Sequence, residues 1–137
     1  MFIPLSVQVM KLFRSKSPPA PSGLSRQEAL QCTPVVNSSV AVQELDSGEI
    51  VVEYPLPMKP FFLSLFRRFQ QSQEFPTKKL QLDAMGSNVW REIDGNRNVS
   101  RIINRFADHY HITIQEAEKS VTTFLFELGR RGIIAMR

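Results

Sequence analysis

The sequence predicts an α+β fold of the winged-helix type, with a three-stranded antiparallel sheet followed by three helices. Two observations carry this prediction. Residues 40–54 and 79–82 hold short runs that alternate between apolar and polar or are rich in β-branched residues, as is typical of strands. Three segments with helical spacing of their apolar residues follow between residues 84 and 132. A chain of 137 residues has room for one compact domain but not for two independent cores.

The N-terminal part is predicted to be a flexible tail and linker over residues 1–33, ahead of a domain at residues 34–137. Residues 14–25 are basic and rich in Pro and Ser, a composition that buries too little apolar surface to order the backbone. Ser25 has Glu28 three residues later, which is the spacing of a capping box. This pair predicts one helical turn immediately after the linker.

The predicted sheet starts with a hairpin. Residues from Val40 to Leu45 alternate between apolar and polar, and residues from Ile50 to Tyr54 are mainly β-branched or aromatic. The polar residues 46–49 between them include a glycine and predict a short turn. A third strand is predicted from Lys79 to Leu82, with its two leucines facing the core.

The three predicted helices run from about Ala84 to Ile93, from Val99 to Tyr110, and from Thr113 to Gly132. Each has an apolar stripe at spacings of three and four residues and begins with a residue suited to cap its N-terminus. The predicted caps are Asp83, Asn98 and Thr113, the last completed by Glu116 in a capping box.

Residues 58–76 form an insert between the second and third strands. Five apolar residues of this insert share one face of a predicted amphipathic helix, namely Phe61, Phe62, Leu65, Phe66 and Phe69. We expect this face to dock a partner, to line the binding groove or to pack on the protein's own core. An adaptor that docks through this insert is therefore an alternative function. Anchoring to a membrane surface is a weaker alternative, because Arg67 and Arg68 are the only basic residues within the predicted helix.

No residue pattern in the chain predicts catalysis or a bound cofactor. Cys32 is the only cysteine, which excludes an intramolecular disulfide and a cysteine-rich metal site. His109 and His111 are two residues apart, so they do not share a helical face as two metal ligands would. The sequence also lacks a glycine-rich phosphate loop and a nucleophile elbow. We therefore expect a binding protein that is not an enzyme and holds no metal or cofactor.

The sequence favours a cytoplasmic protein. The lone cysteine suits a reducing compartment, and no apolar run reaches the ~20 residues needed to span a membrane. Residues 1–13 resemble a signal peptide only superficially, because no basic residue precedes the apolar stretch and no small-residue cleavage site follows it. The sequence leaves open whether Met1 or Met10 is the start residue, and it does not indicate the oligomeric state.

A peptide is the ligand that the predicted arrangement fits best. A strand at the edge of a sheet can accept a further strand, with main-chain hydrogen bonds giving affinity. We expect the third strand to be that edge and to bind through Lys79, Leu80, Gln81 and Leu82. The third helix would form the wall of a groove through residues outside its core stripe, which are Lys119, Thr122, Thr123, Phe126 and Arg130. The alternative for Phe126 is that it belongs to the core.

A DNA-binding regulator is an alternative function, because two helices around a short turn resemble a helix-turn-helix. Glu116, Glu118 and Glu127 of the third helix argue against it, since phosphates would repel a recognition helix of this acidity. The predicted hairpin also precedes the helices, whereas a DNA-binding wing usually follows the recognition helix. We therefore expect no nucleic acid among the partners.

The residues from Leu82 to Gly132 resemble the PqqD family, whose founding member is coenzyme PQQ synthesis protein D. The resemblance rests on Leu-Asp at residues 82–83, on Asp-Gly-Asn-Arg at residues 94–97, and on the apolar spacing of the two helices that follow. This family is similar to the RiPP recognition elements. Those modules bind the leader of a ribosomally made precursor peptide and present it to a modifying enzyme, often a radical SAM enzyme.

The resemblance implies a peptide-binding chaperone whose partners are a precursor peptide and a modifying enzyme such as a radical SAM enzyme. It implies that the leader adds as a strand beside Lys79–Leu82 and lies against the third helix. Trp90, Asp94, Gly95 and Arg97 would then have architectural roles in the core and in the turn. The insert is not part of the family's minimal pattern, so the resemblance leaves the pathway and the identity of the peptide open.

Overall fold

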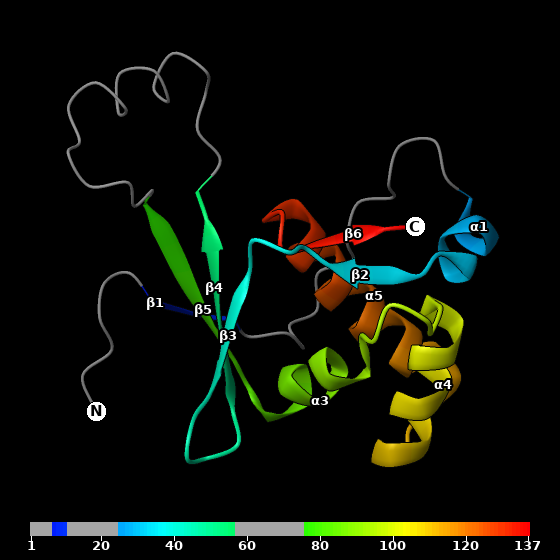
Figure 1. Cartoon of the computed structure of the whole chain (residues 1–137). Coiled ribbons are helices and arrows are strands. Elements are labelled where there is room, and N and C mark those ends of the chain that lie inside the picture. The colour runs from blue at the N-terminus through cyan, green and yellow to red at the C-terminus, as the bar shows by residue number, and fades with distance from the viewer. Residues whose placement is uncertain (1–6, 11–24, 57–75) are drawn as a thin grey trace.

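The computed structural model describes residues 7–10, 25–56 and 76–137. Four strands form one sheet, the three longer helices lie to one side of it, and a second, small sheet joins the two ends of the domain (Figure 1). Most of the predicted linker and nearly all of the predicted insert lie outside the described residues. The five apolar residues expected to dock a partner lie outside them as well, so that expectation stays a prediction.

The main sheet has the strand order β1-β5-β4-β3. Its strands β3 (Ala41–Glu44), β4 (Ile50–Pro55) and β5 (Thr77–Leu82) pair antiparallel and confirm the predicted three-stranded sheet. A fourth strand, β1 (Val7–Met10), adds to the outer side of β5 in parallel orientation. The prediction that β5 is the edge strand is therefore wrong for the described sheet. Pairing between segments so far apart leaves no local signal in the sequence.

The helices α3 (Ala84–Glu92), α4 (Val99–Tyr110) and α5 (Ile114–Arg130) confirm the three predicted ones. In each case the side chain of the predicted cap accepts a hydrogen bond from an amide of the first turn. These amides have no partner within the helix, so the caps fix where each helix begins.

The turn between α3 and α4 is held together by Asp94. One of its carboxylate oxygens accepts hydrogen bonds from the Arg97 and Asn96 amides, both at 2.9 Å. These bonds stabilise the charged form and lower the pKa of Asp94. Gly95 has a φ of 81°, a left-handed conformation that a residue with a side chain adopts only at a cost. This geometry fits the architectural roles that the resemblance implies.

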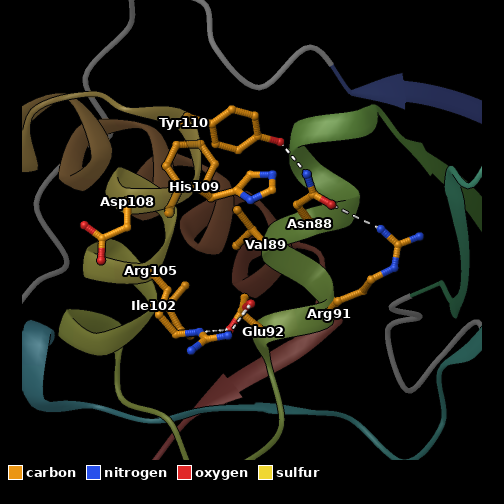
Figure 2. A pocket seen from close by; sticks show the side chains of 10 residues that line it. Asn88, Val89, Arg91, Glu92, Ile102, Arg105, Asp108, His109 and Tyr110 are labelled. Carbon is orange, nitrogen blue, oxygen red and sulfur yellow. Dashed lines mark hydrogen bonds and ion pairs between the residues drawn. The ribbon is translucent and has the colours of Figure 1, made fainter.

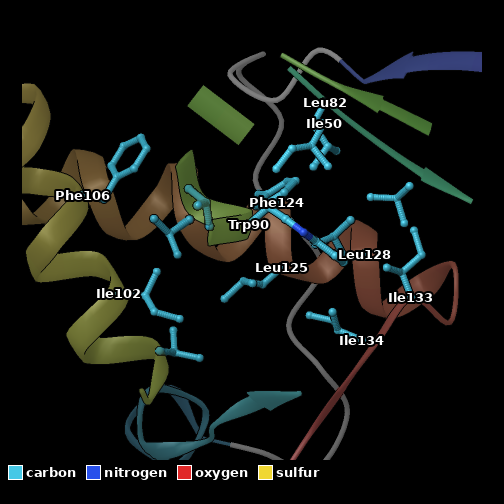
Figure 3. Packing of buried hydrophobic residues seen from close by; sticks show 14 of the residues in the cluster. Ile50, Leu82, Trp90, Ile102, Phe106, Phe124, Leu125, Leu128, Ile133 and Ile134 are labelled. Atoms are coloured by element: carbon cyan, nitrogen blue, oxygen red, sulfur yellow. The ribbon is translucent and has the colours of Figure 1, made fainter. Parts of the chain in front are cut away.

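The core lies between the helices and one face of the main sheet (Figure 3). Leu80 and Leu82 of β5 are fully buried there, as the sequence predicts. Phe124 of α5 is the largest of the fully buried side chains, and Trp90 of α3 is 8% exposed. All five residues of the predicted α5 stripe are buried. Burial of this apolar surface holds α5 against the sheet and fixes the position of β5.

The second sheet consists of β2 (Pro34–Val36) and β6 (Ile134–Met136), which pair antiparallel. No local pattern in the sequence pairs residues 133–136 with Pro34–Val36, because the two segments lie near opposite ends of the domain. This sheet brings the start and the end of the domain together (Figure 1).

The short helix α1 (Arg26–Gln31) precedes β2 and has the predicted capping box between Ser25 and Glu28. Its Arg26 guanidinium binds the Glu118 carboxylate of α5 through two contacts of 2.5 and 2.6 Å. This contact lowers the pKa of Glu118, and the largest cause is the hydrogen bond from Arg26. Residues that were predicted as part of the tail thus contact the last helix of the domain.

Candidate functional site

The four β5 residues predicted to bind a peptide divide into two pairs. The side chains of Leu80 and Leu82 are fully buried, because alternate residues of a strand point to opposite faces of the sheet. On the other face, Lys79 is exposed and Gln81 is half-buried. A ligand beside β5 can therefore reach the side chains of Lys79 and Gln81, but only the main chain of the two leucines.

The outward side chains of β5 contact glutamates of the neighbouring β4 region. The Gln81 side-chain amide donates a hydrogen bond of 3.3 Å to Glu49, and the Lys79 ammonium lies 3.9 Å from the Glu53 carboxylate. Ion pairs this exposed stabilise a fold only slightly. An acidic side chain of a ligand would therefore compete with Glu53 for Lys79.

The outer side of β5 is paired with β1. Each of the four predicted binding residues has one β1 residue beside it, from Val7 beside Lys79 to Met10 beside Leu82. An extended segment of the chain itself thus lies where the sequence analysis expects a bound peptide.

The five α5 residues predicted to line the groove lie outside the buried stripe of the helix. Lys119 and Arg130 are exposed, whereas Thr122, Thr123 and Phe126 are half-buried. The hydroxyl groups of the two threonines donate to main-chain carbonyls one turn earlier in α5, at 2.6 and 2.7 Å. Their donors are engaged within the helix, so a ligand would meet their methyl groups and their oxygen lone pairs.

Phe126 does not belong to the buried core cluster of the described residues. It follows Phe124 by two positions, which is about 200° around a helix, so the two rings leave α5 on opposite sides. Phe124 faces the sheet side (Figure 3). The position of Phe126 is compatible with a surface role, and that role stays a prediction.

Another side of α5 borders the sheet more closely. Arg131, at the C-terminal end of the helix, donates a hydrogen bond of 2.9 Å to the Tyr54 hydroxyl of β4. Helical spacing places Glu127 and Thr123 on the same side as Arg131, and all three are half-buried. The sequence analysis missed Glu127, whose carboxylate lies 2.7 Å from Arg130. Its place three residues after Phe124 puts it next to the core stripe, but this spacing alone does not show that its side of α5 borders the sheet.

An open cleft of about 360 Å³ lies between α3 and α4 (Figure 2). Its lining residues come from these two helices, so it is separate from the predicted site on β5 and α5. The Asn88 side chain donates to the Tyr110 hydroxyl across the cleft. The Arg105 guanidinium binds the Glu92 carboxylate at 2.6 Å, a contact that raises the pKa of Arg105. Many of the polar groups in the cleft are thus already bound to each other.

No group of three or more His, Cys, Asp or Glu side chains among the described residues is arranged to hold a metal ion. None of the helices in the same ranges is long and apolar enough to cross a membrane.

Comparisons with known proteins link this geometry to one family and one solved structure. Residues 75–134 match the family model described as Coenzyme PQQ synthesis protein D (PqqD). The chain is similar to TbiB1, solved in complex with the TbiA(beta) leader peptide, with a TM-score of 0.50 and 18% sequence identity. The similarity covers 73% of this chain and 93% of that chain, and it concerns the fold. No curated protein matches the chain.

Proposed function

We propose that the protein binds the leader of a precursor peptide and presents it to a modifying enzyme, on the premise that residues 75–134, which match the PqqD family model, form a domain of that type. The similar fold of TbiB1 was solved with a leader peptide bound, which supports a peptide as the ligand here. The role is binding rather than catalysis. The chemistry belongs to the partner, for which a radical SAM enzyme is the example that the family resemblance suggests.

The observation that carries this proposal is the pairing on the outer side of β5. That side already accepts a four-residue extended segment, residue by residue, from Lys79 to Leu82. The main-chain donors and acceptors on that side can therefore pair with an extended segment, which is the mode by which many domains bind peptides.

Affinity and selectivity would come from different parts of the site. Main-chain hydrogen bonds to β5 recognise any extended segment, because they do not depend on sequence. Lys79 and Gln81 would select among side chains on the outer face of the sheet. Phe126 would supply apolar contact to a part of the peptide that continues past β5 onto the outer side of α5. An aromatic anchor of this kind often provides much of the binding free energy.

The test is a capture of peptides from a lysate of the native organism by the tagged full-length chain, read by mass spectrometry. Captured peptides are then synthesised and their Kd is measured by fluorescence anisotropy. We expect Phe126→Asp to weaken binding by a factor of about 30 or more, because loss of an aromatic anchor costs at least about 2 kcal/mol. Ile114→Asp is the matched control, since Ile114 is 49% exposed in the first turn of the same helix.

Thermal unfolding of both variants separates binding from folding. If Phe126→Asp unfolds cooperatively near the wild-type temperature and loses the peptide, Phe126 acts in binding. If it loses the fold together with the peptide, Phe126 is a core residue. If the protein instead captures duplex DNA, with an affinity that falls by orders of magnitude over a few-fold rise in salt, the result would support the alternative function as a DNA-binding regulator.

A further inference from the structure

The proposed function assigns no role of its own to the strand β1. It consists of Val7–Met10 and pairs with β5 in parallel orientation. Its register covers Lys79, Leu80, Gln81 and Leu82 one for one, and these are the four strand residues predicted to receive a peptide.

One side of a strand can pair with only one neighbour at a time. β4 pairs with the inner side of β5, and β1 occupies the outer side from Lys79 to Leu82. We infer that β1 is an intramolecular competitor for the peptide-binding side of β5, so that a peptide binds only after β1 has left. This inference rests on the proposed function for the location of the bound peptide.

The geometry of β1 suits a competitor that can be displaced. The strand has only four residues, and parallel pairing is slightly less stable per residue than antiparallel pairing. In the described sheet β1 has a single neighbour, β5. Because β1 is on the same chain as β5, its pairing is intramolecular and does not depend on the protein concentration. A weakly binding segment can therefore still keep unselected peptides away.

The apparent affinity for a peptide depends on the fraction of molecules in which β1 has left β5. The apparent Kd of a peptide equals its intrinsic Kd divided by the fraction of molecules in which the site is free. If β1 is in place in about ten molecules for each open one, its removal tightens peptide binding by about tenfold.

Two substitutions in the full-length chain test the inference. Gln8→Pro with Val9→Pro removes two consecutive amides of β1. Consecutive amides point to opposite sides of a strand, so one of the two must face β5, and proline cannot replace its hydrogen bond. Gln8→Ala with Val9→Ala is the control, because it changes the same side chains and keeps both amides.

The first readout is hydrogen exchange at the amides of Lys79–Leu82. We expect the amides among these that face β1 to exchange about tenfold faster in the proline variant and at the wild-type rate in the alanine variant, whereas the amides that face β4 should exchange equally in all three proteins. The second readout is a fluorescein-labelled synthetic peptide with the sequence of residues 5–12, LSVQVMKL. We expect it to bind the proline variant about tenfold more tightly than the wild type or the alanine variant, and to restore the protection of β5.

Equal exchange and equal peptide affinity in all three proteins would overturn the inference. Protection that rises with protein concentration would also overturn it, since the covering strand would then come from a second copy. Both readouts use the chain's own segment rather than a precursor peptide. A proline variant that binds LSVQVMKL but captures no precursor would therefore refute the proposed function and leave the inference intact.

Discussion

Ser87 gives the sharpest test of how β5 is held in place. It lies in α3 and is 1% exposed, the one buried polar residue among those described. Its hydroxyl accepts a hydrogen bond of 3.0 Å from the Ile50 amide at the start of β4. The same hydroxyl donates to the Leu82 carbonyl at the end of β5, at 3.4 Å. One side chain thus joins a helix to two strands of the sheet.

Replacing Ser87 by alanine removes both bonds without adding volume. The Ile50 amide is then left without its partner in a place where the residue is only 4% exposed. An unsatisfied buried donor costs about 1–3 kcal/mol. For a domain of roughly 60–100 residues, each kcal/mol lowers the melting temperature by about 4–8 °C. We therefore expect Ser87→Ala to lower the melting temperature of the full-length chain by roughly 5–20 °C.

The measurement is thermal unfolding followed by circular dichroism, together with urea unfolding to obtain the free energy of unfolding. Ser120→Ala is the matched control, because Ser120 is half-buried in α5 and its hydroxyl has no partner among the described residues. Its midpoint should stay the same or rise slightly, since alanine is the better helix former. A Ser87→Ala midpoint within about 2 °C of the wild type would refute the reasoning, because it would place the cost of the bare amide well below 1 kcal/mol.

The remaining predictions concern the turn after α3, the end of α5 and the groove. Because its folded-state pKa is lowered, Asp94 stabilises the fold above its unfolded pKa, and this contribution is lost as the pH falls from about 4 through the folded value. Asp94→Asn should therefore unfold at a lower urea concentration than the wild type at pH 7, and the two unfolding midpoints should converge at pH 3. A difference in midpoint that stays the same at both pH values would contradict this role of the Asp94 charge. Gly95→Ala should cost about 1–2 kcal/mol in urea unfolding, because its backbone is left-handed although no atom lies within 4 Å of the new methyl group. Gly129 also has no atom within 4 Å of an added methyl group, but its backbone is helical, so Gly129→Ala should stabilise the fold by up to about 1 kcal/mol. If both substitutions changed the free energy of unfolding in the same direction, backbone conformation would not decide the outcome. Phe126→Asp should remove peptide binding while the melting curve stays cooperative.

The parts of this fold that could be predicted from sequence are those with a local physical cause. A helix begins where a side chain can take up the free amides of its first turn, and the Asp83, Asn98 and Thr113 caps show this directly. The positions of Leu80 and Leu82 follow from the two-residue period of a strand. These signals lie within a few residues of the feature that they predict.

The parts that the sequence did not reveal depend on contacts between distant segments. The β2–β6 pair joins residues near opposite ends of the domain. The Ser87 bridge needs the exact approach of α3 to the sheet, which no spacing rule supplies. On α5, periodicity separated the core stripe from the rest, but it could not show which side of the remaining surface borders the sheet. Glu127 was missed for that reason.

The side of β5 that pairs with β1 has one feature that the sequence predicts and one that it does not. A strand edge offers main-chain donors and acceptors, and every residue except proline has the same ones. The sequence can therefore indicate that an edge exists, through the alternation at Lys79–Leu82, without indicating what pairs with it. The same lack of sequence specificity lets a peptide and the chain's own Val7–Met10 use one set of β5 groups. A site that binds through its main chain is for this reason easily covered by a nearby segment of its own chain, and selectivity must come from the side chains that flank it.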